Sequence, residues 1–251
     1  MKIDIKKDKT LKVMAEGGKR LSAVLDELVH FTKVGTNFLE IEEKAYRDLK
    51  KSGGIPGFTT VEDYRWATCL NVNDGIVHGI PKDYTIKDSD LVSIDIGLLY
   101  EGWHTDMSFS FQVGTQTPRV QRFLQAGKES LNNAFKQVRT GKRVGNISEA
   151  MDSTLRKYGY QGMPELTGHG IGRELHEYPP IPCVPWQPIK QTPMLKKNMT
   201  IAIEVIYVEG DTDYYTSKED GWTIMAADGK MAAVFEKTIA VTDDGYFLLT
   251  P

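Results

Sequence analysis

Apolar residues recur with helical spacing in two stretches near the start of the chain. The first stripe contains Leu21, Val24, Leu25 and Leu28, and the second begins at Phe38 and contains Ile41, Ala45 and Leu49, ahead of Gly53 and Gly54. Residues spaced i, i+3, i+4 and i+7 share one face of a helix, and glycine commonly follows a helix end. The pattern therefore predicts two amphipathic helices.

Strand-like sequence follows these helices. Residues 68–72 and 90–113 are rich in β-branched and aromatic side chains, which favour extended backbone. The longer stretch is interrupted near Tyr100-Glu101-Gly102, where a glycine suits a tight turn. We therefore predict a β-hairpin over residues 90–113.

The second half of the chain repeats this order of elements. One helical stripe contains Val120, Phe123, Leu124, Leu131, Ala134, Phe135 and Val138, with Gly127 on the same face, and a shorter one, ending at Gly159, contains Ile147, Met151, Leu155 and Tyr158. Strand-like sequence then spans residues 200–208 and 231–241. The order of two helices followed by strands thus occurs twice, which predicts an α+β fold of two similar halves. The Pro- and Gly-bearing stretches 53–57 and 179–193 are expected to be surface loops.

Composition narrows the class of protein. A chain of 251 residues fits a single catalytic domain over residues 1–251. Its 31 basic and 34 acidic residues give a net charge of −3, without a phosphate-binding stripe, so we expect no specific nucleic-acid partner. Two cysteines and a lysine-rich start without a long apolar stretch indicate a cytoplasmic protein with free thiols. No window approaches about 18 consecutive apolar residues, so we expect no membrane span.

The predicted hairpin carries two acids among apolar residues, Asp95 and Asp106. A turn at Tyr100-Glu101 would place them directly opposite each other, and a turn at Glu101-Gly102 would make them diagonal neighbours on one face. Either register brings two like charges together, which a shared proton, a basic side chain or a cation must neutralise. Carboxylates on rigid strands suit divalent metal ions. The alternative is a pair of solvated acids on an exposed face.

Two of the five histidines, His169 and His176, lie in a glycine-rich segment. A two-residue turn at residues 172–173 would set them across from each other in one pocket, where ligand or acid–base roles are favoured over purely structural ones. The evidence for the other three is weaker: His78 is alone in its segment, and structure or solvent accounts for His30, on a helix, and His104, in a turn.

Two glutamates interrupt predicted strands in the second half. Glu204 lies within the apolar run 201–206, and Glu236 lies between the apolar runs 232–235 and 238–240. Burying an unpaired carboxylate is costly, so an acid inside a core strand requires a cation, a proton or a basic partner. The alternative is that each glutamate points to the solvent face of a half-exposed strand.

Taken in order, these segments resemble type I methionine aminopeptidases. The resemblance rests on residues 73–81 (NDGIVHGIP), 90–97 (DLVSIDIG), Asp106, 168–176 (GHGIGRELH), Glu204, 221–223 (GWT) and 235–238 (FEKT). It spans nearly the whole chain, and an ordered set of this kind rarely arises by chance. The family implies the pita-bread fold, in which two pseudo-symmetric αβ halves surround a central, mostly antiparallel sheet. The repeated order of elements agrees with that fold.

The resemblance also implies a role for each candidate residue. The metal ligands would be Asp95, Asp106, His169, Glu204 and Glu236, which would hold two divalent ions of Co, Mn, Fe or Zn. Glu204 would also shuttle a proton, His176 would donate to the scissile carbonyl and its oxyanion, and His78 would contact the scissile amide nitrogen. The walls of an apolar methionine pocket would be Phe58, Tyr64, Cys69, Leu175 and Trp222. Cys69 is then a wall residue and not a nucleophile. Trp222 could be ordinary core, but its place beside Gly221 favours the pocket.

The implied activity is removal of the initiator methionine from peptides and nascent proteins when the second residue is small, by attack of a metal-bridging water. The implied partner is the N-terminal methionine of nascent polypeptides, with transient ribosome association, and a chain this short is expected to be monomeric. The sequence departs from the family's usual residues at seven motif positions: Thr105, Met107, Tyr178, Pro179, Pro180, Val205 and Ile206. None of these positions is a metal ligand, so the departures concern substrate preference and loop shape.

Two other functions are alternatives. Aminopeptidase P, prolidase and creatinase-like enzymes use a similar ligand set but usually carry a large N-terminal domain, whereas only about 90 residues precede Asp95 here. A non-catalytic pita-bread protein that binds RNA or partner proteins would generally lack metal ligands and carry basic insertions, and this sequence shows neither. The methionine enzyme is therefore favoured.

Overall fold

The computed structural model describes residues 3–251. Its first half consists of two helices followed by strands, as predicted. The elements are α1 (Asp8–Phe31), α2 (Phe38–Lys51), β1 (Ile55–Pro56), a 3-10 helix (Gly57–Thr60), β2 (Thr68–Val72), β3 (Gly75–Val77), β4 (Leu91–Tyr100) and β5 (Trp103–Gln112).

The second half repeats this order with more strands. The elements are α3 (Pro118–Phe135), α4 (Val144–Tyr158), β6 (Gln161–Gly162), β7 (Thr167–Gly170), β8 (Glu177–Pro182), a 3-10 helix (Ile189–Gln191), β9 (Thr200–Val208), β10 (Tyr214–Thr216), β11 (Ile224–Ala226), β12 (Ala232–Val241) and β13 (Tyr246–Leu248). Every strand pair is antiparallel. The predicted α+β architecture is therefore confirmed.

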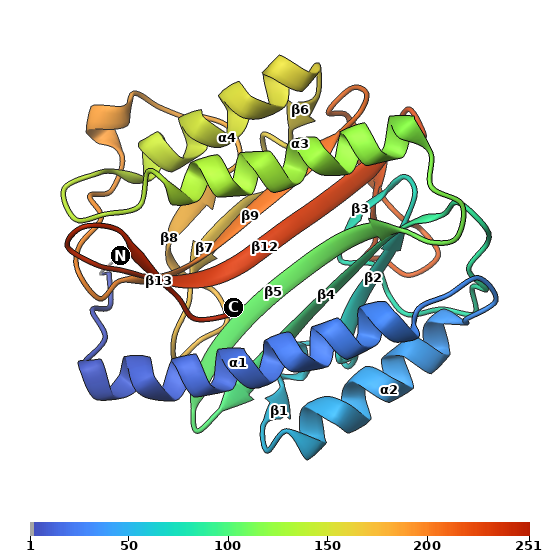
Figure 1. The fold of residues 1–251 in the computed structure, drawn as a ribbon, viewed down its shortest axis with the longest axis horizontal. Helices are drawn as coiled ribbons and strands as arrows, with labels where there is room; N and C mark the ends of the chain where they lie inside the picture. The colour runs from blue at the N-terminus through green and yellow to red at the C-terminus, as the bar shows by residue number, and fades with distance from the viewer. Residues whose placement is uncertain (1–2) are drawn as a thin grey trace.

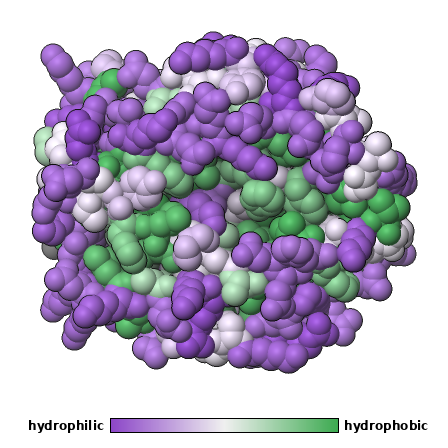
Figure 2. Space-filling model, in the orientation of Figure 1, coloured by the Kyte–Doolittle hydropathy of each residue, from purple (hydrophilic) through white to green (hydrophobic). Residues whose placement is uncertain are grey.

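The long strands form the centre of the molecule. β4 pairs with β5, and β9 pairs with β12. Figure 1 shows these strands running between the helices α1 and α2 on one side and α3 and α4 on the other, with β5 beside β12. In the same orientation, polar side chains follow the outer parts of the surface and an apolar band crosses the middle (Figure 2). The two halves thus meet along β5 and β12.

The predicted helical stripes face the core, because nearly all of their apolar residues are buried. α2 begins at a capping box in which Asn37 accepts from the N–H of Leu39 and Glu40 accepts from the N–H of Asn37. α4 ends at Gly159, whose φ of 85° lies in the left-handed region that glycine favours. Val138 differs from the prediction, since it lies beyond the end of α3.

Within residues 3–251, no helix is both long and apolar enough to span a membrane.

The predicted loops 53–57 and 179–193 both contain strand residues. Residues 179–182 belong to β8, which is an edge strand of a sheet with the order β13-β12-β9-β7-β8. The short strand β6 also belongs to this sheet, because it pairs with β9. An edge strand tolerates prolines because its outer N–H groups have no ladder partner. Residues 55–56 form β1, which pairs with β4. The loop predictions were wrong for these residues because proline marks an edge strand as well as a loop.

Side-chain hydroxyls join the two halves where β5 meets β12. Thr238 Oγ1 accepts from the N–H of Asp106 at 2.9 Å and donates to the Asp106 carbonyl oxygen at 2.7 Å. Ser110 Oγ accepts from the N–H of Val234 at 2.9 Å and donates to the Val234 carbonyl oxygen at 2.8 Å. The backbones of the two strands are thus linked through side chains, and Asp106 is held at the junction.

Candidate active site

The two aspartates of the first hairpin adopt the diagonal arrangement. The hairpin turns at Glu101 and Gly102, whose φ angles of 47° and 78° suit a two-residue turn. Asp95 therefore lies opposite Ser108, two residues from Asp106 on the same strand. Of the two registers that the sequence allowed, the structure has the second, and both aspartates line one cavity.

The second half brings three further candidates to this cavity. Glu204 of β9 and Glu236 of β12 are directly opposed, so each of the four long strands contributes one acid. His169 of β7 places Nε2 at 3.4 Å from Glu204 Oε1 and 3.8 Å from Asp106 Oδ2. Asp106, His169 and Glu236 each offer an atom within 4.8 Å of the other two. This spacing suits donors that share one ion.

The cavity has no cationic side chain to balance its acids: among residues 3–251, no lysine or arginine lines it. Asp95 Oδ1, Asp106 Oδ1 and Glu236 Oε1 are buried without a hydrogen-bond partner. Burial raises the pKa of Asp95 to about 8, and burial together with mutual repulsion raises the pKa of Asp106, Glu204 and Glu236 well above the usual range. Protons or metal ions must neutralise this group, and the donor set fits divalent cations.

His169 presents a nitrogen suited to a metal. Its Nδ1 lies 2.8 Å from the carbonyl oxygen of Gly170, so Nδ1 carries the proton and donates it. Nε2 therefore keeps its lone pair and faces Asp106 and Glu204. Burial lowers the pKa of His169 to about 3. The ring is consequently neutral at neutral pH, which is the state that binds metal.

His176 shares the cavity with His169, as expected, but by a different register. The two ring centroids lie 4.5 Å apart at an interplanar angle of 79°. Gly170 pairs with Glu177 instead of leaving a two-residue turn, so His176 belongs to a longer loop, residues 171–176. The cavity leaves His176 accessible, yet desolvation lowers its pKa. The predicted pairing was wrong because it assumed the shortest possible turn.

The other histidines divide as follows. His78 lines the cavity just after β3, with a left-handed φ of 57°. His30 is exposed on α1, where it contacts the carbonyl oxygen of Asp26. His104 was wrongly placed in a turn: it is buried in β5, and its backbone N–H donates to the carbonyl oxygen of Gly172 at 2.8 Å. The tight hairpin explains this error, because β5 already begins at residue 103.

An apolar recess continues the cavity, whose volume is about 320 Å³. Its walls include all five predicted pocket residues: Phe58, Tyr64, Cys69, Leu175 and Trp222. The Tyr64 ring packs edge to face against Phe58 at 6.3 Å and Trp222 at 5.1 Å, and its hydroxyl donates to the carbonyl oxygen of Thr68 at 2.7 Å. Burial raises the pKa of the Cys69 thiol well above its usual range. Cys69 therefore stays protonated and uncharged.

The sequence pattern of Metallopeptidase family M24 matches residues 12–243. The chain belongs to this family. Within M24, methionine aminopeptidase 1 of Bacillus subtilis is 36% identical over 245 residues, which cover 98% of each chain. The methionine aminopeptidase of Aquifex aeolicus is 34% identical over 257 residues, covering 100% of this chain and 99% of the relative. These relatives identify this M24 protein as a metal-dependent aminopeptidase.

Solved structures of M24 proteins share the fold. The methionine aminopeptidase from Thermotoga maritima superposes with a TM-score of 0.95 at 33% identity, covering 99% of both chains. A prolidase from Pyrococcus furiosus gives a TM-score of 0.79 at 20% identity, over 98% of this chain but 65% of its own. The pita-bread fold predicted from the sequence is thereby confirmed.

The cavity of this M24 protein is lined by every candidate residue named from the sequence, and by six residues that were not anticipated: Val61, Val77, Glu165, Leu166, Thr167 and Ile206. Strand alternation could have found Thr167 and Ile206, because each lies two residues from a candidate ligand. The other four lie in loops or in the short strand β3, where no periodic pattern marks the buried face.

Proposed function

We propose that this chain hydrolyses the first peptide bond of peptides and nascent proteins that begin with methionine, when the second residue is small. The observation that carries this proposal is the convergence of four acids and His169 beside an apolar recess. The methionine aminopeptidases of Bacillus subtilis and Aquifex aeolicus, which match almost end to end, support the choice of substrate.

We assign Asp95, Asp106, His169, Glu204 and Glu236 as the ligands of two divalent ions, drawn from Co, Mn, Fe and Zn. The unpartnered acid oxygens and the free Nε2 lone pair of His169 support this assignment. Such ions, when bound, would supply a nucleophilic water at neutral pH and polarise the scissile carbonyl. The five side chains that would hold these ions all lie on strands, which keeps their donor atoms preorganised.

Three residues are proposed to handle protons and the substrate. A Glu204 carboxylate oxygen accepts the proton of the attacking water and returns it to the leaving amine, from a position that lines the cavity beside His169. His176 donates to the carbonyl oxygen, which becomes more negative in the transition state. His78, across the same cavity, contacts the scissile amide nitrogen.

The apolar recess is proposed to bind the methionine side chain. A thioether gains from contact with aromatic rings, and Phe58, Tyr64 and Trp222 present three of them. Leu175 and the uncharged Cys69 complete the walls. A charged or strongly polar first side chain would lose its hydration there without gaining a partner.

We further infer that the protein acts in the cytoplasm as a monomer, with transient contact to the ribosome. The near-neutral net charge of −3 supports a transient contact over stable RNA binding. The ligands and the recess all come from one chain, so the proposed chemistry requires no second copy.

The test is metal-dependent cleavage of a defined peptide. Protein stripped by a chelator should regain cleavage of methionine-alanine-serine when Mn²⁺ or Co²⁺ is restored, and Asp106→Asn should not. His176→Ala should retain metal binding but lose about a hundredfold in kcat, because it removes a hydrogen bond made mainly in the transition state. Release of a residue that precedes proline, without release of methionine, would instead indicate a prolidase-like activity.

A further inference from the structure

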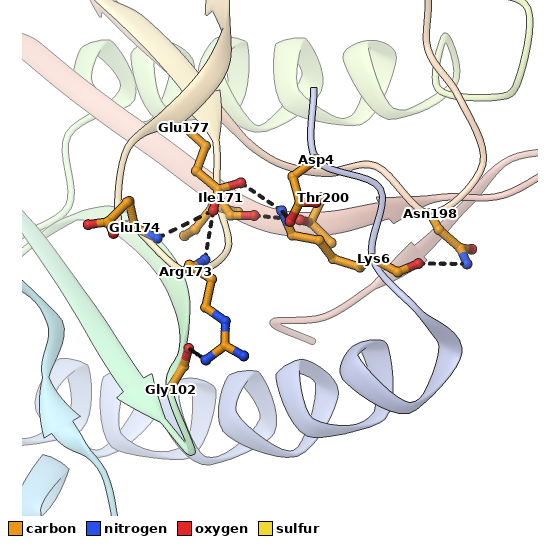
Figure 3. Close-up of polar contacts among 9 residues, drawn as sticks. All are labelled: Asp4, Lys6, Gly102, Ile171, Arg173, Glu174, Glu177, Asn198 and Thr200. Atoms are coloured by element: carbon orange, nitrogen blue, oxygen red, sulfur yellow. Dashed lines mark hydrogen bonds and ion pairs between the residues drawn. The ribbon is translucent and has the colours of Figure 1, made fainter. Parts of the chain in front are cut away.

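Lys6 is buried, although it lies in the short segment before α1. Its side chain is 1% exposed, and Nζ lies 2.6 Å from Glu177 Oε2 and 2.9 Å from Asp4 Oδ2 (Figure 3). Its backbone is also held: the N–H of Lys6 donates to the carbonyl oxygen of Asn198 at 3.0 Å, and Asn198 Nδ2 donates to the carbonyl oxygen of Lys6 at 3.1 Å. Lysine is rarely buried without a specific partner; Lys6 has two, the exposed Asp4 and the more buried Glu177.

Glu177 uses its other carboxylate oxygen to hold the loop 171–176. Oε1 accepts from the backbone N–H of Arg173 at 2.7 Å and from that of Glu174 at 3.3 Å. Glu177 also follows His176 directly in the chain. One carboxylate therefore connects Lys6 to the loop that presents His176 to the cavity (Figure 3).

The loop is confined on its other side as well. Arg173 Nη1 donates to the carbonyl oxygen of Gly102 at 3.2 Å, and the guanidinium lies 4.1 Å from the ring centroid of Trp103. A Cβ atom at Gly172 would lie 2.4 Å from Lys6 Nζ, so the ammonium group packs directly against the loop backbone. Lys6 thus occupies the space beneath the loop as well as providing its counter-charge.

We propose that Lys6 and Glu177 are positioning residues that set the orientation of His176 for the reaction. Neither residue lines the cavity, so they act through the loop backbone and do not touch the substrate. The inference rests on the proposed function of His176. It adds that full activity requires the N-terminal segment that contains Lys6. This segment is far from the other site residues in the sequence.

Steady-state kinetics with a methionine-alanine-serine peptide provide the first test. Lys6→Met removes the charge at similar length, and it should lower kcat about tenfold while KM stays within about threefold, because a misplaced His176 weakens a contact made mainly in the transition state. Glu177→Gln keeps an acceptor oxygen for the two N–H groups but loses the charge, and it should have the same effect. The control is Lys44→Met, which breaks the partly buried Lys44–Asp48 pair on α2 and should leave kcat unchanged.

A double-mutant cycle separates positioning from general damage. In the His176→Ala background, Lys6→Met should change kcat less than twofold, because the residue through which Lys6 acts is already gone. A tenfold loss in both backgrounds would overturn the proposal. An unchanged kcat for both folded variants, Lys6→Met and Glu177→Gln, would overturn it as well.

Hydrogen exchange tests the positioning without any catalysis. The amides of Arg173 and Glu174 should exchange at least about tenfold faster in Lys6→Met than in the parent protein, while those of β9 and β12 keep their rates. Unchanged exchange in the loop 171–176 would overturn the proposal. If the parent protein releases no methionine, the proposed function fails, whereas this measurement still decides whether Lys6 holds the loop.

Discussion

Glu204 and Glu236 face each other directly across the β9–β12 pair, and both carboxylates belong to the same cavity. Like charges in opposed positions destabilise a sheet. Asp95 and Asp106 repeat the problem, as diagonal neighbours, on the other pair of long strands. The acids at the centre of this fold therefore disfavour the folded state unless protons or cations neutralise them.

Glu236→Gln should stabilise the metal-free protein and weaken metal binding. The substitution replaces one of two opposed, buried acids with a neutral amide, a gain of about 1 kcal/mol in the free energy of unfolding, but it also removes a proposed ligand. Urea denaturation in the presence of a chelator measures the first effect, and calorimetric titration with Mn²⁺ the second. Glu149→Gln, at an exposed position on α4, should change neither. A metal-free Glu236→Gln protein less stable than its parent would contradict the prediction.

The metal-free protein should lose stability as the pH rises from 6 to 9. Burial raises the pKa of Asp95 to about 8, so the protonated carboxyl favours the folded state. Its contribution is complete below the unfolded pKa near 4 and disappears as the pH rises through about 8. One such proton gives a slope of at most about 1.4 kcal/mol per pH unit.

Denaturation with a chelator at pH 6, 7.5 and 9 measures this slope. Asp95→Asn, which has no titrating carboxyl, should show a shallower dependence. Saturating Mn²⁺ should reverse the trend, because protons compete with the metal for the same oxygens. Equal slopes for the parent and Asp95→Asn would refute the assignment to Asp95.

Thr238→Val should destabilise the protein by about 2 to 3 kcal/mol. It removes the hydroxyl that serves both the N–H and the carbonyl oxygen of Asp106, and buried polar groups without partners are costly. Thr238→Ser keeps the hydroxyl and should retain most of the stability. Urea unfolding of the three proteins makes the comparison, and a valine variant as stable as the serine variant would show that the hydroxyl contributes little.

Trp222→Ala should lower kcat/KM for a methionyl peptide about tenfold by removing one aromatic wall of the recess. Trp222→Phe should retain more activity, because it preserves a ring beside Tyr64. Trp186→Ala is the matched control, since Trp186 is 52% exposed and does not line the cavity. Equal kinetics for Trp222→Ala and the parent enzyme would assign Trp222 to the core instead of the pocket.

The sequence predicts the parts of the fold whose patterns are periodic. The stripes beginning at Leu21 and Val120 define helices because only one face of each is buried. For the hairpin the sequence allows two registers, since Tyr100-Glu101 and Glu101-Gly102 both suit a short turn. Positive φ angles at residues 101 and 102 belong to the register that forms. Such a difference of one residue depends on local backbone conformation, which a hydrophobic pattern does not encode.

The acidic candidates stand out in the sequence as anomalies, since an acid within an apolar strand is unusual, whereas the pocket residues are implied only by the family resemblance. Features that rest on distant contacts gave no such signal. The loop before Glu177 is wider than a tight turn, and the Glu177 side chain bonds across it. The partner of that side chain, Lys6, lies 171 residues away in the sequence. Neither spacing nor composition predicts a contact of this kind.

The junction at Thr238 has a consequence for assembly of the protein. The proposed ligands Asp95 and Asp106 come from the first half, and His169, Glu204 and Glu236 come from the second, so neither half alone contains a complete centre. Metal affinity is then linked to the docking of the halves, and each strengthens the other. At a free metal concentration one hundred times Kd, the docked state gains about 2.7 kcal/mol over any state that cannot bind the metal. Ions held by the proposed ligands would thereby also connect the two halves across the middle of the molecule.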